Sequence, residues 1–580
     1  MRRATGGEIS ARSPKYAPLS TDPVDVEGGA VDADPSTIVQ SKLKVIFGAS
    51  VALILFIMAS VYVSQTYRSK QEIDTGRLQV ATWNIAAINN NPFEYWLTLN
   101  DPFYDTTMEE VQRFITSPGS LDVYVSSVFS NDMFEDLVKK MKKNKNFKNN
   151  AIKGVVSLWN SDFKNRKIVS QFMKDPLLGL KRLTSMPDRV TNTIPLAQSK
   201  FAYRPTVINC YQSSLNNVKE WWPKWLKFMF DDSLNTVKMG SVIPANMLKI
   251  IPRAKYKELS ELEEEISIPL QTLVGAIFDS ILVHMMTHVD IAAGKGNSGK
   301  TWQSLRTQIC ESLNLKKNHR LIEILETSYG NMDIVCLQEV AASFMSKLQS
   351  SSILMNSYHL VKPAKLSSSD QNSVVLLSKK KFPKGITEDL TKYLKFDDPK
   401  MVAQGDVLIV HATDHIGRNF VVGSFHGDTN GMATIPVVKS VLRLLHKEDL
   451  FVFGMDANTY EHGKPGKTQD VTEFADTLNI LQLGSVRGDV PDPTDYTTFN
   501  ARTFLQPQLN KASSKSEIRS KGDVNPKDFI IYFKKSMSSS GFLKDNTGNR
   551  EYQEEMVFPT LQFPSDHGVM FTALDLPDRI

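Results

Sequence analysis

The stretch "FVFGMDANTY", Phe451 to Tyr460, begins with a run of apolar and β-branched residues that predicts a buried β-strand. Two polar side chains, Asp456 and Asn458, follow the run and are separated only by Ala457. A side chain at the end of a strand is tethered to rigid backbone, which is how a reactive site is held in place. We therefore interpret this stretch as a strand that delivers a carboxylate and an amide to the edge of a sheet.

Other apolar runs along the chain also end or begin with polar side chains. These are Asn84 in "ATWNIA", Glu339 in "DIVCLQEV", His426 in "VVGSFHGD", Asp528 in "KDFIIYF", and Asp566 and His567 in "FPSDHGVMF". Taken singly, Asp, Asn and His at strand ends are also typical turn formers. Together, carboxylates, amides and imidazoles without a cysteine favour a hard, oxygen-seeking cation such as Mg²⁺ over zinc.

This series of motifs, in this order, resembles the endonuclease/exonuclease/phosphatase superfamily, which has the deoxyribonuclease-I-like fold. That family is recognised by a "WN" strand, a "QE" strand, a strand with His, an Asp-x-Asn strand, a late Asp and a terminal "SDH", and all six occur here. The resemblance covers roughly residues 78–97 and 316–578. It implies a catalytic domain of the α/β (α+β) class, with two packed mixed β-sheets flanked by helices.

The resemblance also implies how the metal and the attacking water are held. Glu339 would be the principal ligand of Mg²⁺, with Mn²⁺ as the alternative, and Asn84 and Asp566 would support it. Asp456 would orient or deprotonate the attacking water, while Asn458 helps to fix that carboxylate and the phosphate. These five residues are the predicted metal and water side of the site.

The remaining predicted residues concern the phosphate. The resemblance implies that His567 contacts the phosphate and that Asp528 is its carboxylate partner, which would favour the imidazolium form. His426 matches the family's other histidine, although the sequence "HGDTNG" after it departs from the family pattern. Lys379 stands where the family often has an arginine, and we expect it to bind substrate.

The predicted function is therefore hydrolysis of a phosphodiester by in-line attack of a Mg²⁺-assisted water, in a nuclease-like or other phosphodiesterase. The substrate would be a nucleic acid or a phospholipid head group, and a lipid phosphodiesterase of sphingomyelinase or phosphoinositide type is the alternative. A non-catalytic, membrane-tethered scaffold is a reading of another class. The complete set of polar strand-end residues argues against a scaffold, which has no need of them.

The N-terminal part of the chain predicts a membrane anchor. Residues 1–41 are rich in Gly, Pro, Ser, Thr and Asp and predict a disordered tail. Residues 43–65 contain "VIFGASVALILFIMASVYV", an uncharged run that spans roughly 28 Å as a helix, close to the hydrocarbon thickness of a bilayer. We expect a single transmembrane helix here. The basic residues close to the run and those of the whole N-terminal tail predict opposite orientations in the membrane. The side on which the catalytic domain lies therefore stays open.

Between the first two motifs lies a long block, residues 98–315, whose apolar patterns predict mainly helices. We interpret this block as a helical insertion in the catalytic domain. An insertion attached near the rim of the site would shape substrate access or bind a partner.

This block ends in "GKGNSGKT", Gly294 to Thr301, which fits the phosphate-binding pattern G-x-x-x-x-G-K-[S/T] through Gly299, Lys300 and Thr301. A nucleotide-binding loop of this kind needs a strand before it, and the preceding "SILVHMMTHVDIAA" predicts the end of a helix instead. We favour a flexible turn between two helices. A P-loop nucleotide-binding protein and a basic loop that touches the substrate phosphate are the alternatives.

Composition sets broader limits. The 580-residue chain is 41% hydrophobic and 23% charged, which is typical of a folded protein, and its net charge of +5 permits a polyanionic partner without requiring one. The three cysteines, Cys210, Cys310 and Cys336, are too few and too scattered to predict a disulfide framework or a zinc site. We expect buried free thiols.

Overall fold

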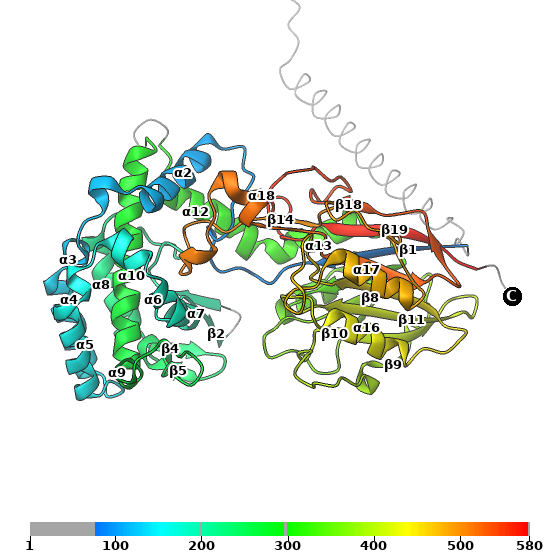
Figure 1. Ribbon diagram of the computed structural model, residues 1–580, viewed down its shortest axis with the longest axis horizontal. Coiled ribbons are helices and arrows are strands. Elements are labelled where there is room, and N and C mark those ends of the chain that lie inside the picture. The colour runs from blue at the N-terminus through cyan, green and yellow to red at the C-terminus, as the bar shows by residue number, and fades with distance from the viewer. Residues whose placement is uncertain (1–75, 198–199, 295–298, 578–580) are drawn as a thin grey trace, which may run out of the picture. The chain divides into compact units, whose positions relative to one another are not determined.

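The computed structural model describes residues 76–197, 200–294 and 299–577 (Figure 1). The predicted disordered tail and the predicted transmembrane helix lie outside these residues. The described residues belong to one compact unit, Asp74–Ile580. Within it, two mixed β-sheets are joined through a common core.

The first sheet is built around β1 (Arg77–Asn84), which pairs in parallel with β6 (Ile334–Gln338) and antiparallel with β19 (Val569–Asp575). Its full order is β17-β19-β1-β6-β8-β7, with β18 also paired to β19. The other strands are β7 (Tyr358–Val361), β8 (Val374–Ser378), β17 (Ser538–Ser539) and β18 (Leu543–Asp545). The 249 residues between β1 and β6 therefore separate two neighbouring strands of one sheet.

The second sheet has the order β13-β16-β12-β11-β10-β9. Its central pair, β11 and β12, is parallel, and the other pairs are antiparallel. The strands are β9 (Ile386–Asp389), β10 (Val407–Thr413), β11 (Asn419–His426), β12 (Leu450–Asp456), β13 (Leu483–Ser485) and β16 (Asp528–Phe533). A separate two-stranded ribbon joins β14 (Thr498–Asn500) to β15 (Asp523–Asn525).

The two large sheets pack face to face because alternate residues of their strands are apolar. One buried cluster contains Val80 and Cys336 from the first sheet with Val422 and Val452 from the second. The outer face of the second sheet forms another cluster with α16 (Thr434–Leu442) and α17 (Val471–Ile480), which lie over it in Figure 1. The predicted fold class, with packed mixed β-sheets flanked by helices, is confirmed.

The block between β1 and β6 is mostly helical, but it also holds a four-stranded sheet that the sequence did not predict. The strands, in the order β3-β2-β4-β5, are β2 (Thr193–Leu196), β3 (Lys200–Tyr203), β4 (Leu234–Thr236) and β5 (Gly240–Val242). The longer helices are α2 (Pro102–Thr116), α4 (Asn131–Lys143), α5 (Asn149–Ser161), α8 (Val218–Phe230), α10 (Ser267–Ala292) and α12 (Trp302–Cys310), followed by α13 (Lys317–Thr327). These strands have only three or four residues each, too short to show a clear two-residue alternation in the sequence.

Helix α10 is the core of this block. Among the described residues it alone is long and apolar enough to cross a membrane, but 83% of its most apolar window is buried inside the protein. Asp279, in the middle of the helix, binds the buried Arg204 through Nε at 2.7 Å and accepts the indole N–H of Trp225 at 2.9 Å. A buried carboxylate is tolerated when it is paired and hydrogen-bonded in this way. Helix α10 therefore serves here as a core helix of the block between β1 and β6.

Two of the three cysteines form a disulfide, which corrects the prediction of free thiols. Cys210 and Cys310 are joined across 100 residues of sequence, with their Cα atoms 5.7 Å apart. Only Cys336 is free among the described residues, and it is buried. The prediction failed because a single pair that is distant in sequence carries no spacing pattern. The disulfide ties the end of α12 to the segment that follows β3.

The described parts of "GKGNSGKT" do not form the local structure of a nucleotide-binding loop. Helix α10 precedes the motif, and α12 follows it. Thr301 is the N-cap of α12 and accepts the backbone N–H of Ser304, while Lys300 forms an ion pair with Asp101 at 2.7 Å. Because a P-loop follows a strand of a parallel sheet, this geometry favours the predicted turn between two helices.

Candidate active site

The polar residues that the sequence placed at strand ends lie at one edge of the two-sheet sandwich. In the first sheet, parallel pairing aligns Asn84 of β1 with Gln338 of β6, so Glu339 follows at the same edge. In the second sheet, His426 of β11 aligns with Asp456 of β12, and Asp456 aligns with Asp528 at the start of β16. The register of the strands therefore brings side chains from five segments of the chain together.

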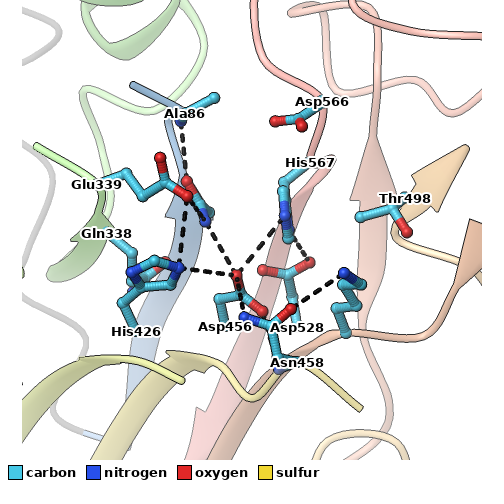
Figure 2. A network of polar contacts seen from close by, with 12 residues as sticks. Ala86, Gln338, Glu339, His426, Asp456, Asn458, Thr498, Asp528, Asp566 and His567 are labelled. Carbon is cyan, nitrogen blue, oxygen red and sulfur yellow. Dashed lines mark hydrogen bonds and ion pairs between the residues drawn. The ribbon is translucent and has the colours of Figure 1, made fainter. Parts of the chain in front are cut away.

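Asp456 is the centre of this group (Figure 2). One oxygen, Oδ2, accepts a hydrogen bond from Asn84 Nδ2 at 2.9 Å, which links the second sheet to the first. The same oxygen lies 3.7 Å from His426 Nε2 and 3.6 Å from His567 Nε2. The Asp456 side chain is 1% exposed. A buried carboxylate between two imidazoles is well placed to hold a water molecule and to take a proton from it.

Glu339 is held in its ionised form. The backbone N–H of Ala87 and the side-chain amide of Gln371 both donate to Oε2 at 2.8 Å, and His426 Nε2 lies 3.4 Å from Oε1. Burial alone would raise the pKa of Glu339, but His426, the Ala87 amide and the Asn84 amide lower it to about 2. Its side chain is 19% exposed, so the carboxylate is both charged and accessible.

Asn84 is in the cluster, but its orientation differs from the prediction that its oxygen supports a metal. Its Oδ1 accepts the backbone N–H of Ala86 at 2.9 Å. Its Nδ2 therefore points to Asp456 and, at 3.3 Å, to Glu339. In this structure Asn84 orients the two carboxylates, because the turn after β1 engages its oxygen.

His567 and Asp528 form the predicted pair. His567 Nδ1 lies 3.0 Å from Asp528 Oδ2, and the Asp528 side chain is fully buried. Burial alone would lower the pKa of His567, but Asp528 and Asp456 raise it to about 10. His567 is therefore an imidazolium at neutral pH, a fixed positive charge next to the carboxylates.

Sequence reasoning missed a buried lysine beside Asn458. Lys527 Nζ donates to Asn458 Oδ1 at 3.0 Å and to Asp523 Oδ2 at 2.7 Å. Burial alone would lower the pKa of Lys527, but Asp523 and Asp456 outweigh it and hold the pKa above its ordinary value. Because Lys527 engages its oxygen, Asn458 turns its Nδ2 toward Asp456 and the Gly427 carbonyl. The only sequence signal for Lys527 is its position directly before Asp528.

Three residues of the site have positive φ although none is glycine. They are Ala86 at 54°, Glu339 at 55° and Asn458 at 51°. Such conformations are uncommon for these residues, and they persist where the surrounding contacts over-determine them. Here each lies one or two residues beyond the end of a strand, where the chain turns a polar side chain or a backbone N–H into the cluster.

Asp566 lies at the rim of this group, and burial raises its pKa. It faces Lys317, a lysine of α13 that is 3% exposed and that sequence reasoning also missed. Lys317 Nζ donates to the Ala87 carbonyl at 3.2 Å, and burial lowers its pKa to about 8. It belongs to the region between the first two motifs, where no family pattern pointed to a site residue.

The structure does not bring Lys379 to the cluster. Strand β8 runs antiparallel to β6, and its first residue, Val374, pairs with Leu337 at the site edge. Lys379 follows the other end of β8, where its side chain donates to the Met355 carbonyl. The segment before β8 supplies Gln371 to Glu339 instead. The prediction failed because it did not take account of the direction of β8.

Comparisons with known proteins find one family model and several distantly similar solved structures. No curated protein matches the chain. A family model described as a domain of unknown function, DUF8234, matches residues 122–307. These residues all lie between β1 and β6.

Three similar solved structures are each 14% identical in sequence to this chain. A humanized D. rerio TDP2 is 14% identical, with 44% of this chain and 90% of that chain covered and a TM-score of 0.29. The human Nocturnin catalytic domain with bound sulfate is 14% identical, with 45% and 87% covered and a TM-score of 0.31. An endonuclease/exonuclease/phosphatase from Bacteroides vulgatus is 14% identical, with 46% and 94% covered and a TM-score of 0.32.

Proposed function

We propose that this protein is a metal-dependent phosphoester hydrolase that cleaves a phosphodiester by in-line attack of water. One observation carries the proposal. Asp456 lies in a buried position between the two imidazoles of His426 and His567 and is linked through Asn84 to the ionised Glu339. Hydrolysis of a phosphate ester requires a general base, a cationic group and a carboxylate that can bind a metal ion. All three lie in this cluster.

The residues fit a hard divalent cation. Glu339 and Asp566 both line the same cavity and offer carboxylate oxygens, while Cys310 in the same lining is held in the disulfide. Asp456, Asp528 and His567 also have ligand atoms within 4.8 Å of one another. We assign the last two as an ion pair, since they already bind each other at 3.0 Å. Glu339 with Asp566 would therefore hold Mg²⁺, or Mn²⁺, which neutralises phosphate oxygens and assists the leaving oxygen when bound.

The protein's own groups divide the remaining work. Asp456 orients the water and accepts its proton, because its Oδ2 faces the two imidazoles from a fixed position. The His567 imidazolium stabilises the charge on the phosphate oxygens, and Asp528 keeps it protonated. Asn458 is a positioning residue, since Lys527 fixes its amide with the N–H groups toward Asp456. The bond from water oxygen to phosphorus forms as the bond to the leaving oxygen breaks.

The first test uses bis-p-nitrophenyl phosphate, which carries no feature specific to nucleic acid or lipid. The full chain in detergent is expected to release p-nitrophenolate with Mg²⁺ or Mn²⁺ and to lose at least about 100-fold in rate with EDTA, since the metal stabilises transition-state charge. The rate should return when excess Mg²⁺ is added. Equal rates with and without EDTA would contradict a metal-dependent mechanism. Nucleic acid, sphingomyelin and phosphoinositide substrates, compared next, separate the nuclease-like function from the lipid phosphodiesterase.

The disulfide supports a proposal about location. Disulfides persist in oxidising compartments and are rare in the cytosol. We propose that the domain from Asp74 onward lies on the non-cytosolic side of the membrane that the segment 43–65 would cross. This choice also accords with the count of basic residues in the whole N-terminal tail, Arg2, Arg3, Arg12, Lys15, Lys42 and Lys44, which would then be cytosolic.

Thiol counting tests this proposal. Protein from cells lysed in excess alkylating agent should show one alkylated cysteine, Cys336, after denaturation, and Cys210 linked to Cys310. Dithiothreitol should then lower the free energy of unfolding by about 3 to 5 kcal/mol, because the disulfide closes a loop of 100 residues. The double variant Cys210→Ser/Cys310→Ser is the control, and its stability should not respond to dithiothreitol. Three alkylated cysteines in the wild type would contradict an oxidising location.

A further inference from the structure

A cavity of about 290 Å³ adjoins the candidate active site. Glu339, Asp566 and Lys317 are among the residues that line it. Its other walls come from the loop that follows β1, from the end of the insertion and from the segment before β19. The apolar residues that matter here are Ile88, Leu97, Ile309, Leu313, Pro559 and Pro564. The insertion therefore builds part of a cavity that is also lined by Glu339 and Asp566, the carboxylates that would hold the metal ion.

The polar side chains in the walls already have partners within the protein. Asn89 donates to Glu94 at 3.1 Å and accepts the Asn91 N–H, while Asn91 donates to the Leu505 carbonyl at 2.6 Å. Glu94 also forms an ion pair with Arg502 at 3.0 Å. Because these groups are engaged, the walls away from Glu339 offer a ligand mainly apolar surface. The cavity thus combines charged groups, among them Glu339, Asp566 and Lys317, with apolar walls.

The insertion is tied firmly to this cavity. Ile309 and Cys310 end α12, and the disulfide joins Cys310 to Cys210. The π-helical turn η6 (Glu311–Leu315) follows, and it carries Leu313 in the cavity wall. Asn314 then donates to the Asn89 carbonyl at 3.3 Å, which links η6 to the loop after β1. The position of Leu313 is thus fixed by a covalent bond on one side and a hydrogen bond on the other.

The direction of the reaction assigns a role to the cavity. In-line displacement places the attacking water and the leaving oxygen on opposite sides of phosphorus. Asp456, which holds the water, does not line the cavity, whereas Glu339 and Asp566 do. A leaving group that departs from phosphorus on the side away from Asp456 would enter this cavity.

We propose that this cavity is the leaving-group pocket and that it selects an uncharged, apolar group. The proposal rests on the proposed phosphodiester hydrolysis and names the class of its substrate. A phosphate at the Glu339 end then contacts Lys317, and the apolar group contacts Leu313 and Ile309. Leu313 of the insertion and Lys317, two residues beyond its end, are the residues that determine specificity.

Binding tests the pocket without requiring turnover. Phenylphosphonate and methylphosphonate carry the same charged head but differ in the apolar group, and neither is hydrolysed at its P–C bond. In calorimetry with Mg²⁺, phenylphosphonate should bind the wild type at least about tenfold more tightly than methylphosphonate, because the ring is buried in an apolar pocket. Equal affinities would overturn the proposal, even for a protein that hydrolyses phosphodiesters.

A matched pair of variants locates the binding. Leu313→Trp fills the cavity and should remove the tenfold preference for phenylphosphonate while methylphosphonate binds as before. Leu315→Trp is the control, since Leu315 lies on the same turn η6 and is 54% exposed outside the cavity lining. Preference retained in Leu313→Trp would overturn the proposal, as would equal loss in both variants. Circular dichroism and thermal unfolding identify a variant that fails to fold, and Leu313→Met then takes its place with a smaller loss expected.

Hydrolysis separates this proposal from the proposed function. For p-nitrophenyl and 4-methylumbelliferyl phosphodiesters, the enlarged pocket of Leu313→Ala should shift the ratio of kcat/KM values toward the larger leaving group by about tenfold. Leu315→Ala should leave the ratio unchanged. A protein that binds phenylphosphonate selectively but hydrolyses neither ester would contradict the proposed function and retain the pocket. A protein that hydrolyses both esters with a ratio unaffected by Leu313→Ala would contradict the pocket alone.

Discussion

Asp456→Asn is expected to lower kcat for phosphodiester hydrolysis by about 10³-fold, within the range that general-base catalysis contributes. The amide has nearly the shape of the carboxylate but cannot accept a proton from water. KM should change little, because Asp456 contacts the attacking water and not the bound phosphate. The measurement is steady-state hydrolysis of bis-p-nitrophenyl phosphate at saturating Mg²⁺, with the variant's fold checked by circular dichroism.

Asp476→Asn provides the matched control for this substitution. Asp476 is an exposed carboxylate on α17, away from the cluster, so the same chemical change should leave kcat within about twofold. A loss of less than threefold in Asp456→Asn would contradict the role of Asp456 as base. Comparable losses in both variants would point to a general effect on charge or stability instead.

Asp528→Asn is expected to lower kcat by about 10² to 10³-fold through its effect on His567. Asp528 is buried and supplies the negative charge that raises the pKa of His567 to about 10. Without that charge the pKa of His567 falls, and the imidazolium that would stabilise the phosphate oxygens is less populated. His567→Asn should have a similar effect, because it removes the same cation.

The double variant distinguishes this pair from two independent contributions. If Asp528 acts through His567, the double variant Asp528→Asn/His567→Asn should lose no more activity than His567→Asn alone. Multiplied losses would contradict the pairing. His462→Asn is the control, because His462 is 88% exposed and lies outside the cluster. Its kcat should equal that of the wild type.

The strand-end residues could be predicted because their signal is local. An apolar run ending in a polar residue marks the edge of a sheet, and edges of parallel strands coincide. Asn84 with Glu339 and His426 with Asp456 follow from this rule, as the registers of β1 with β6 and of β11 with β12 confirm. Their roles in catalysis remain predictions, since geometry alone does not measure activity.

The features that sequence reasoning missed depend on distant contacts. The Cys210–Cys310 pairing spans 100 residues, and Lys317 reaches Ala87 across 230. Lys379 was misplaced because the direction of β8 decides which of its ends meets Glu339. The orientation of Asn84 depends on one backbone N–H, that of Ala86. Such choices are made by the folded chain, and no local pattern of residues specifies them.

The Glu339→Gln variant tests the central claim most directly, namely that this cluster hydrolyses phosphodiesters with a divalent metal. Hydrolysis of bis-p-nitrophenyl phosphate is measured against Mg²⁺ concentration for the wild type, Glu339→Gln and Glu323→Gln, whose carboxylate lies 48% exposed on α13. The account predicts saturable Mg²⁺ dependence in the wild type and Glu323→Gln, and a rate at least about 100-fold lower in Glu339→Gln. Wild-type activity in Glu339→Gln with an unchanged Mg²⁺ response would contradict the account.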